Sequence, residues 1–349
     1  MSQINTIKNQ NQNNNFSSSS FSSNTENSEI KADHKTDLKT NLKTNLKADE
    51  LIVKAEKRMK PNFASFLLSN SNTRYTEAAE MYIKAGALYK INKNWNEAGK
   101  AYVCAAKIYF KDLQSPQEAC LHYIEAAVAY KHCNTLCAIQ NYQLAVQLRM
   151  EENQFCLAAK LWREIGDLYK KDLSFYDAIR MYQKAIDCYD AEDKKVNSRE
   201  LYSIIADILI EQEQYEQAVK IYEQVIELSL QMINGKWKIK EYCFKTLLCT
   251  LIISVQKDNL NLLEDKMNEY KNNVLELEGT LDIKFIENLK QTIDEEDIDA
   301  FKTLIQKYDS ICKLDSWIIK LLVNIKTILE QGLPNSKEQK ENEEDPVGV

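Results

Sequence analysis

The sequence predicts an all-α protein built as a solenoid of antiparallel helical hairpins. Three observations support this fold class: a regular aromatic repeat, alanines at helical spacing around it, and a scarcity of glycine and proline, with seven and four in 349 residues. A β-barrel, a β-sandwich or a doubly wound α/β fold of this size needs many turn residues with positive φ, and glycine adopts that conformation most easily. No proline lies within residues 117–333, so no proline there forces a helix to break.

An aromatic residue marks each predicted helix at steps of 19 to 21 residues. The series is Tyr82, Tyr102, Tyr123, Tyr142, Trp162, Tyr182, Tyr202, Tyr222 and Tyr242. Most members have an alanine three or four positions before them and a small or branched residue three positions after, for example Ala79 and Ala85 around Tyr82. These offsets place all three side chains on one helical face.

Two repeats of this length form a hairpin of about 40 residues, because a helix of roughly 14 residues and a short loop fill one repeat. Small residues beside large aromatics are typical of right-handed, tetratricopeptide-like solenoids, although the usual period of those is about 34 residues. Gly86, Gly99 and Gly166 fall inside the predicted helices. Since glycine weakens a helix, we expect close backbone packing at these positions.

The ends of the chain differ from the repeat region. Residues 1–47 contain an Asn/Gln/Ser tract and then a repeated Lys-Thr-Asp/Asn-Leu unit from Lys35, and we expect a disordered extension whose Lys–Leu repeat could become helical on binding. The first helix of the fold is expected at Ala48–Lys60. Residues 332–349 carry two prolines and a run of acidic residues, which predicts an acidic flexible tail.

The solenoid is expected to span residues 48–258, and a C-terminal helical bundle residues 259–331. The aromatic repeat ends after Tyr242, and further amphipathic segments follow. These predict helices at Leu260–Leu277, Ile283–Ile293, Ile298–Ile311 and Ser316–Leu329. Such a bundle would close the open end of the stack, as solenoids require.

Composition excludes several classes of function. The formal net charge of −7 argues against a general nucleic-acid binder. The longest nearly apolar run, Leu247–Val255, is too short to span a bilayer, and no apolar signal region opens the chain. Nine cysteines at helical core spacing suit reduced thiols, so we expect a cytoplasmic protein.

No catalytic signature is found: no Walker loop, no paired glycine fingerprint, no HExxH and no serine nucleophile elbow. The pairs nearest to a metal site are Cys120 with His122, and His132 with Cys133 and Cys137. A structural zinc site assembles four ligands at recognised spacings, and these residues do not. We expect neither enzymatic activity nor a cofactor.

Several strings along the repeat region resemble the soluble attachment proteins that link the N-ethylmaleimide-sensitive factor (NSF), an ATPase, to SNARE complexes, especially their alpha type. The strings are Lys93-Asn-Trp-Asn-Glu-Ala-Gly99, Ala158-Ala-Lys160, Tyr215-Glu-Gln-Ala-Val-Lys-Ile-Tyr-Glu-Gln-Val225, Glu241-Tyr-Cys-Phe-Lys-Thr-Leu-Leu-Cys249 and, most specifically, Tyr308-Asp-Ser-Ile-Cys-Lys-Leu-Asp-Ser-Trp317. The resemblance runs from about Ala48 to Gln331 and implies a non-enzymatic adaptor. The adaptor would bind assembled SNARE complexes, recruit and stimulate the ATPase for their disassembly in vesicular transport, and associate with membranes peripherally.

The alternative function is a tetratricopeptide-type scaffold that holds an extended peptide, such as a chaperone or signalling adaptor. The resemblance implies instead that basic residues face the acidic SNARE bundle. The matching positions are Lys90, Lys93, Lys131, Lys160 and, next to a position that departs from the family, Arg199. A further lysine pair of the family corresponds to Glu200 and Ile204, so this helix departs from the family's charge pattern.

Two more sites follow from the resemblance. The residues Phe63, Phe66, Leu67 and Leu68 match the family's membrane-touching loop, although they could instead staple the first helix to the solenoid. Acidic residues are expected to contact the ATPase, and they are Asp294, Glu295, Glu296, Asp297, Glu343, Glu344 and Asp345. Either Leu333 or Val347 could replace the family's near-terminal leucine.

Overall fold

The structure is a computed structural model that describes residues 23–60, 71–231 and 238–331, with the backbone alone for residues 23–40. The helices are α1 (Ser23–Met59), α3 (Ser71–Ile91), α4 (Trp95–Lys111), α5 (Pro116–Tyr130), α6 (Thr135–Glu151), α7 (Phe155–Lys171), α8 (Phe175–Asp190), α9 (Lys195–Glu211), α10 (Tyr215–Leu230), α11 (Ile239–Gln256), α12 (Asn261–Asn273), η2 (Leu275–Leu277), α13 (Leu281–Asp294), α14 (Ile298–Ile311) and α15 (Ser316–Gln331). No strand occurs in these ranges, so the all-α prediction is confirmed there.

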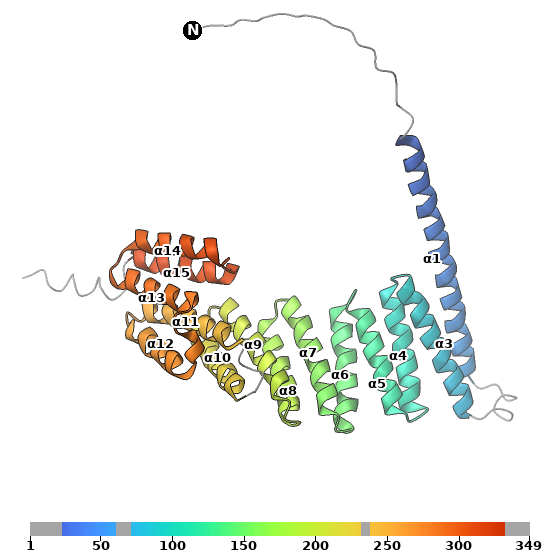
Figure 1. The fold of residues 1–349 in the computed structure, drawn as a ribbon. Coiled ribbons are helices and arrows are strands. Elements are labelled where there is room, and N and C mark those ends of the chain that lie inside the picture. Colours follow the sequence, from blue (N-terminus) through green and yellow to red (C-terminus); the bar gives the residue numbers. More distant parts are fainter. Residues whose placement is uncertain (1–22, 61–70, 232–237, 332–349) are drawn as a thin grey trace, which may run out of the picture. The chain divides into compact units, whose positions relative to one another are not determined.

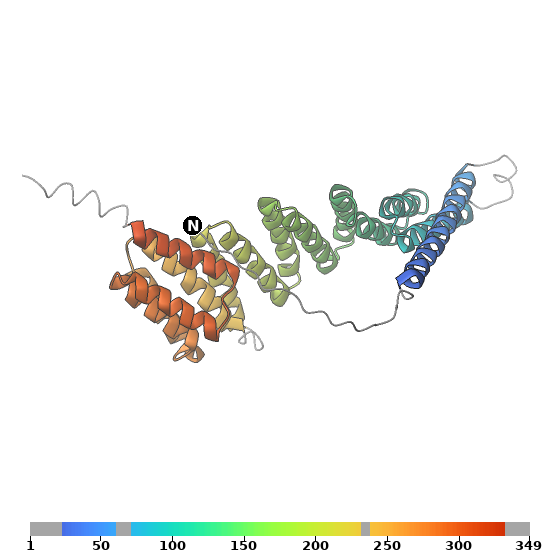
Figure 2. The ribbon, with the colours of Figure 1, turned by 90° about the horizontal axis from the view of Figure 1, so that it is seen from above.

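The chain divides into two compact units, Met1–Cys133 and Asn134–Val349. In the first unit α1 packs against α3, α3 against α4, and α4 against α5. In the second unit each helix from α6 to α11 packs against the next one along the chain. These neighbours can be followed in Figures 1 and 2. Packing of consecutive helices is what the repeat predicts.

The aromatic repeat lies at the helix interfaces. Seven of its nine members are buried, and Trp162 and Tyr202 are half-buried. The alanines before the aromatics are fully buried: Ala79, Ala98, Ala119, Ala138, Ala158, Ala178 and Ala218. Alanine at these positions lets a neighbouring tyrosine ring lie close to the helix backbone. The predicted pattern of small and large residues on one face is therefore confirmed.

At the three glycines within described helices, the backbone lies close to a tyrosine ring. A Cβ on Gly99 in α4 would lie 2.5 Å from the Cζ of Tyr130 in α5. A Cβ on Gly166 in α7 would lie 2.7 Å from the Cε1 of Tyr182 in α8. Gly86 in α3 meets Tyr102 in α4 at 3.0 Å. Separations under 3.0 Å are sterically excluded for a real side chain, so close packing explains Gly99 and Gly166, whereas a Cβ at Gly86 would be in tight contact with the Tyr102 ring.

The turns correct one premise of the sequence analysis. Among the described residues, eight other than glycine adopt positive φ: Lys93, Gln114, Asn153, Leu173, Asp193, Glu213, Asp258 and Glu296. Each follows the end of a helix. After α3, for example, the Lys93 N–H donates to Lys90 O at 3.0 Å and the Asn94 N–H to Tyr89 O at 2.8 Å. The chain does use left-handed turn residues, and hydrogen bonds to the last helical carbonyls compensate for their strain.

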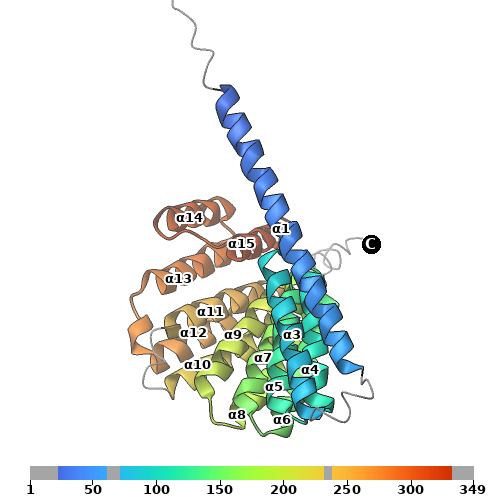
Figure 3. The ribbon, with the colours of Figure 1, turned by 90° about the vertical axis from the view of Figure 1, so that its right-hand side faces the viewer.

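The last helices pack differently. α11 is buried along most of its length and contacts α10, α12, α13 and α15 (Figure 3). Tyr308 of α14 stacks on Phe285 of α13 with ring centroids 3.9 Å apart, and its hydroxyl donates to Asp282 at 2.6 Å. The Leu314 N–H donates to Asp309 Oδ1 at 2.8 Å. The most specific string of the sequence thus holds α13, α14 and the turn before α15 together.

Helix boundaries agree with the sequence in part. α14 has the predicted bounds, and α13 and α15 are each slightly longer than expected. The helix predicted at Leu260–Leu277 is instead α12 followed by the short 3₁₀ helix η2. α1 begins at Ser23, so it runs through part of the segment expected to be an extension. The three boundaries between the four predicted segments stay predictions.

Candidate partner-binding surfaces

Two of the predicted SNARE-facing lysines lie at the end of α3, and they differ in how they are held. Lys90 Nζ is 2.7 Å from Glu125 Oε2 of α5 and 5.7 Å from the centre of the Tyr102 ring. Lys93 is exposed, and no ion pair of its side chain occurs among the described residues. A lysine already paired within the fold offers less charge to a partner than an exposed one. Lys93 is therefore the better candidate of the two.

An aromatic stack links the start of α4 to the loop after α5. The rings of Trp95 and His132 are 4.1 Å apart and inclined by 21°. Trp95 lies two residues after Lys93, and His132 directly follows Lys131. The stack thus brings together the two segments that carry these lysines. Sequence reasoning missed this contact, although Trp95 belongs to one of the strings that carry the family resemblance.

In the second unit the predicted Lys160 is exposed on α7. Beside it, Lys184 of α8 lies over the Trp162 ring at 4.4 Å from its centre. Arg163 of α7 pairs with Glu200 of α9 at 2.9 Å. Burial alone would lower the pKa of the Arg163 guanidinium, but the hydrogen bond and charge of Glu200 raise it.

The position that departs from the family pattern therefore has a partner in this chain. Glu200 stands where the resemblance implies a lysine, and it pairs with Arg163 of α7. Arg199, predicted to face the SNARE bundle, is half-buried on α9. Lys160 of α7 and Lys184 of α8 are exposed, and Lys194 and Lys195 at the start of α9 are exposed as well.

The acidic group before α14 has structural contacts of its own. Asp294, the last residue of α13, pairs with Lys290 at 3.0 Å, and this bond raises the pKa of the lysine. Glu295 accepts a hydrogen bond from Gln291 at 2.9 Å. Asp297 caps α14 by accepting from the Ala300 N–H at 2.8 Å. The site predicted for the ATPase is thus partly a helix capping site.

Other predicted site residues lie outside the described residues. They are Phe63, Phe66, Leu67 and Leu68 of the predicted membrane loop, and Glu343, Glu344 and Asp345 of the tail. Leu333 and Val347 lie outside them as well.

A partly buried ionic group lies between α9 and α11. Lys245 pairs with Asp207 at 2.9 Å and with Glu241 at 3.4 Å, and its side chain is 14% exposed. Burial lowers the pKa of this amine, and the two carboxylates outweigh that effect and raise it. Asp207 also accepts the Tyr222 hydroxyl. Since every member has a partner, the cluster is a structural network that fixes α9, α10 and α11 against one another.

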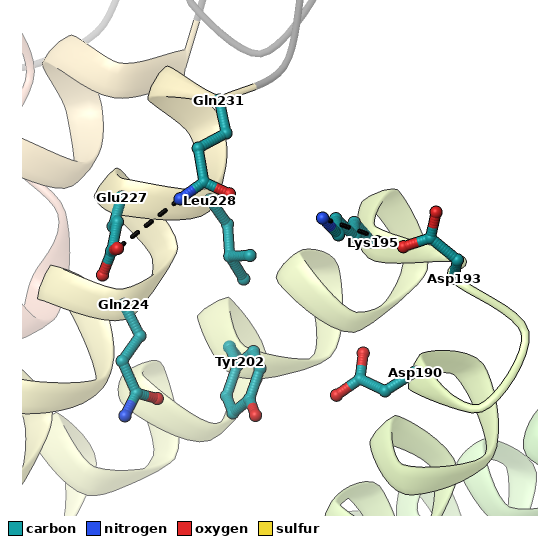
Figure 4. A pocket seen from close by; sticks show the side chains of 8 residues that line it. All are labelled: Asp190, Asp193, Lys195, Tyr202, Gln224, Glu227, Leu228 and Gln231. Atoms are coloured by element: carbon teal, nitrogen blue, oxygen red, sulfur yellow. Dashed lines mark hydrogen bonds and ion pairs between the residues drawn. The ribbon is translucent and has the colours of Figure 1, made fainter.

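The cavity shown in Figure 4 is lined mainly by polar side chains. Its volume is about 350 Å³, and the lining residues are Asp190, Asp193, Lys195, Tyr202, Gln224, Glu227, Leu228 and Gln231. Its side chains bond to near neighbours: Asp190 to Ser198, Lys195 to Asp193, and Gln231 to Glu227. Within the described ranges no three His, Cys, Asp or Glu residues could hold a metal ion together. Among the helices described, none is long and apolar enough to cross a membrane.

Comparisons with known proteins give one family. The model of the soluble NSF attachment protein family matches residues 46–330. Beta-soluble NSF attachment protein of Bos taurus is 30% identical over 286 residues, 81% of this chain and 94% of that protein. Alpha-soluble NSF attachment protein of Mus musculus is 28% identical over 283 residues, 80% and 94% of the two chains. Vesicular-fusion protein SEC17 of Komagataella phaffii is 30% identical over 284 residues, again 80% and 94%.

Proposed function

The chain belongs to the soluble NSF attachment protein family, and on that basis we propose that it binds assembled SNARE complexes and recruits the NSF ATPase to disassemble them during vesicular transport. Members of this family are adaptors and not enzymes. The observation that carries the proposal is the extent of the match, which begins within α1 and ends within α15. The match therefore takes in nearly all of the described helices.

Basic residues of α3 to α7 are the proposed contact with the acidic SNARE bundle. Lys93 and Lys160 are exposed, and the Trp95–His132 stack holds the segment of Lys131 against the start of α4. Several moderate charge contacts of this kind give a fast, salt-dependent association. Lys90 is proposed to contribute less, because Glu125 already neutralises it.

Acidic residues near the C-terminus are the proposed contact with the ATPase. Glu296 has positive φ and stands between two residues with structural contacts, Glu295 and Asp297. A cationic surface of the ATPase would attract this cluster over a Debye length, about 8 Å at physiological salt. The tail residues Glu343, Glu344 and Asp345 would extend the same attraction.

Membrane association is proposed to be peripheral and to take place in the cytoplasm. Phe66 and Leu67 stand in a segment of apolar residues between α1 and α3. Insertion of a few such side chains gives weak, reversible binding. SNARE complexes would then supply most of the attachment to the membrane.

One observation favours the alternative of a peptide-binding scaffold. A groove of about 520 Å³ on α8, α9 and α10 combines apolar side chains such as Phe175, Ile179 and Leu209 with five glutamines and a single charged residue, Lys220. Grooves of this kind accept uncharged extended segments in other solenoids. The two functions predict different ligands, a folded helical bundle and an extended peptide.

A binding experiment separates these functions. The full chain is immobilised and offered either an assembled four-helix SNARE bundle or one SNARE segment alone, at low and at moderate salt. The adaptor function predicts capture of the bundle, weakened by salt, and recruitment of NSF to the captured bundle. Capture of the isolated segment in preference to the bundle would support the scaffold and contradict the adaptor.

A further inference from the structure

One face of the helix α1 packs against α3 of the first unit. Ala48 and Ala55 are fully buried against the first unit. Asn92 Nδ2 donates to Asn41 O at 2.8 Å and to Asn45 Oδ1 at 2.9 Å. The N-terminal part of α1 projects past the end of α3, its neighbour in this unit (Figures 1 and 3). One side of the helix is therefore anchored to α3, and the other side faces away from it.

The side that faces away carries an apolar row. Leu42 is 63% exposed, Leu46 56% and Val53 47%. At about 100° per residue these three side chains lie within about 40° of one another on the helix surface, opposite the buried alanines. Isolated exposed leucines are ordinary on protein surfaces, but an aligned row on one helix is a candidate interaction surface.

A basic row runs beside the apolar one. Each apolar residue is followed directly by an exposed lysine: Lys43, Lys47 and Lys54. Lys54 lies 3.9 Å from Glu50, an exposed carboxylate one turn earlier on α1. The two rows have the same spacing, so they lie side by side along α1. We call these six residues the Leu–Lys face. Another Leu-Lys pair, Leu38 and Lys39, occurs four residues before Leu42 and Lys43 and belongs to the same helix.

We propose that the Leu–Lys face of α1 binds the surface of an anionic lipid membrane. An amphipathic helix that pairs an apolar row with a lysine row can place its leucines at the acyl boundary while the lysine stems extend to the phosphates. Each lysine near an anionic leaflet also adds electrostatic attraction. A partner helix could cover the apolar row, but only an acidic partner would match the adjoining lysines, and anionic lipid supplies that charge over the whole length of the face.

The face adds a lipid contact to the proposed function and depends on neither SNARE complexes nor the ATPase. Leu42 and Lys43 precede the segment matched by the family model, which starts at residue 46. The face therefore begins in a part of the chain outside that match. α1 ends at Met59, shortly before the predicted membrane loop with Phe66 and Leu67. The face on α1 would therefore be followed along the chain by a second lipid contact. Two weak contacts joined in one chain bind far more tightly than either alone.

Liposome flotation of the full chain without SNARE complexes tests the proposal. Vesicles contain phosphatidylcholine alone or with phosphatidylserine. The variants are L42S/L46S/V53S and K43E/K47E/K54E. Matched controls make the same number and kind of substitutions at exposed residues elsewhere: L136S/L144S/L157S on α6 and α7, and K100E/K107E/K111E on α4. F66S/L67S measures the loop separately.

We expect the wild type to bind the phosphatidylserine vesicles preferentially, and each face variant to lose binding at least about tenfold while the controls retain it. Binding of the face variants to a soluble SNARE bundle should be unchanged, which separates this inference from the proposed function. Equal losses in face variants and controls would overturn it. So would light scattering that shows a wild-type dimer converted to a monomer by L42S/L46S/V53S, with lipid binding unaffected.

Discussion

Helices α3–α7 and helices α8–α10 are built in the same way and carry opposite charge. Residues 71–171 contain 13 Lys+Arg and 10 Asp+Glu, whereas residues 172–231 contain 6 and 13. Four of the five predicted SNARE-facing residues fall in the first region. The fifth, Arg199, is half-buried and next to Glu200 in the second. The repeat fixes the backbone and the interfaces but leaves the exposed charge free to vary, so function must be argued from the surface positions.

The interfaces of the two regions are alike in detail. Tyr142 of α6 and Tyr182 of α8 are almost fully buried, at 2% and 0% exposure. Four residues before each of them stands a fully buried alanine, Ala138 or Ala178. Gly99 and Gly166 both lie in the first region and each meets a tyrosine of the following helix; for Gly166 that tyrosine is Tyr182 of the second region. If packing is shared and charge is not, changes to packing should act equally in both regions, and changes to charge should not.

The largest expected effect comes from removing a repeat tyrosine. Tyr142→Ala and Tyr182→Ala should each lower the free energy of unfolding by about 3–5 kcal/mol, because truncation of a buried ring leaves a cavity. Tyr182 also loses its 2.7 Å hydrogen bond to Asp167. Urea unfolding followed by circular dichroism measures both variants. A loss of more than about 2 kcal/mol in one region and none in the other would refute the shared packing.

A smaller loss should come from adding one methyl group at a glycine. Gly99→Ala and Gly166→Ala should each destabilise by about 1–3 kcal/mol through overpacking, although alanine normally stabilises a helix. The companion change Tyr130→Ala should make the Gly99→Ala loss smaller, because a Cβ then has room.

A control separates crowding from backbone strain. Gly279 has φ of 74°, and a Cβ at this position would have no neighbouring atom within 4 Å. Gly279→Ala should therefore destabilise by about 1 kcal/mol through conformation alone. Stabilisation by Gly99→Ala, measured in the same urea titrations, would contradict the close approach to Tyr130.

Charge changes should act on binding and not on stability. Glu200→Lys removes the partner of Arg163 and adds positive charge to the second region. Because Glu200 is 53% exposed, its ion pair should contribute no more than about 1 kcal/mol to folding. The affinity for an acidic SNARE bundle should rise up to about fivefold at low salt. Glu216→Lys, also exposed but on α10, is the control; an equal rise in both would show a net-charge effect without a defined surface.

The smallest effect concerns pH and is confined to the first region. His122 packs against the Tyr109 ring at 5.2 Å, and burial lowers its pKa even though Glu118 and Glu125 oppose that shift. The unfolded chain therefore binds the proton more readily, and stability should fall as pH drops below about 6.5. His122→Phe should reduce this slope in urea titrations between about pH 7 and pH 5.

Met181 of α8 and Ile221 of α10 occupy the position in the repeat that His122 has in α5, directly before the repeat tyrosine. Neither side chain titrates, so these two positions add no pH dependence of stability. A slope unchanged by His122→Phe would show that other groups cause the acid sensitivity.

The repeat made the helical array predictable, because burial of Ala and Tyr follows directly from their spacing. The turns were not predictable in the same way. Residues as different as Leu173 and Glu213 adopt positive φ, since the geometry of the helix end and its hydrogen bonds outweigh residue preference. The length of α1 also exceeded expectation; the Lys and Leu of its repeat are good helix formers, and no glycine or proline interrupts residues 23–60.

The candidate site was predictable only as a set of residue types. Spacing along the chain does not reveal that Lys90 reaches Glu125, 35 residues away, or that Trp95 stacks on His132. Nor does a run of acidic residues show which one caps a helix, as Asp297 does. Long-range partners decide how much charge each side chain presents, and one sequence without its fold cannot supply them.

The most direct test of the proposed adaptor function is the salt dependence of binding to an assembled SNARE bundle, measured by calorimetry for the wild type and for K93E/K131E/K160E. We predict that wild-type affinity falls as salt rises, and that the triple variant loses more than about tenfold at low salt with unchanged helicity. K84E/K100E/K107E, which reverses three other lysines of α3 and α4, should bind within about threefold of the wild type. Equal affinities of the wild type and K93E/K131E/K160E at both salt concentrations would contradict the account.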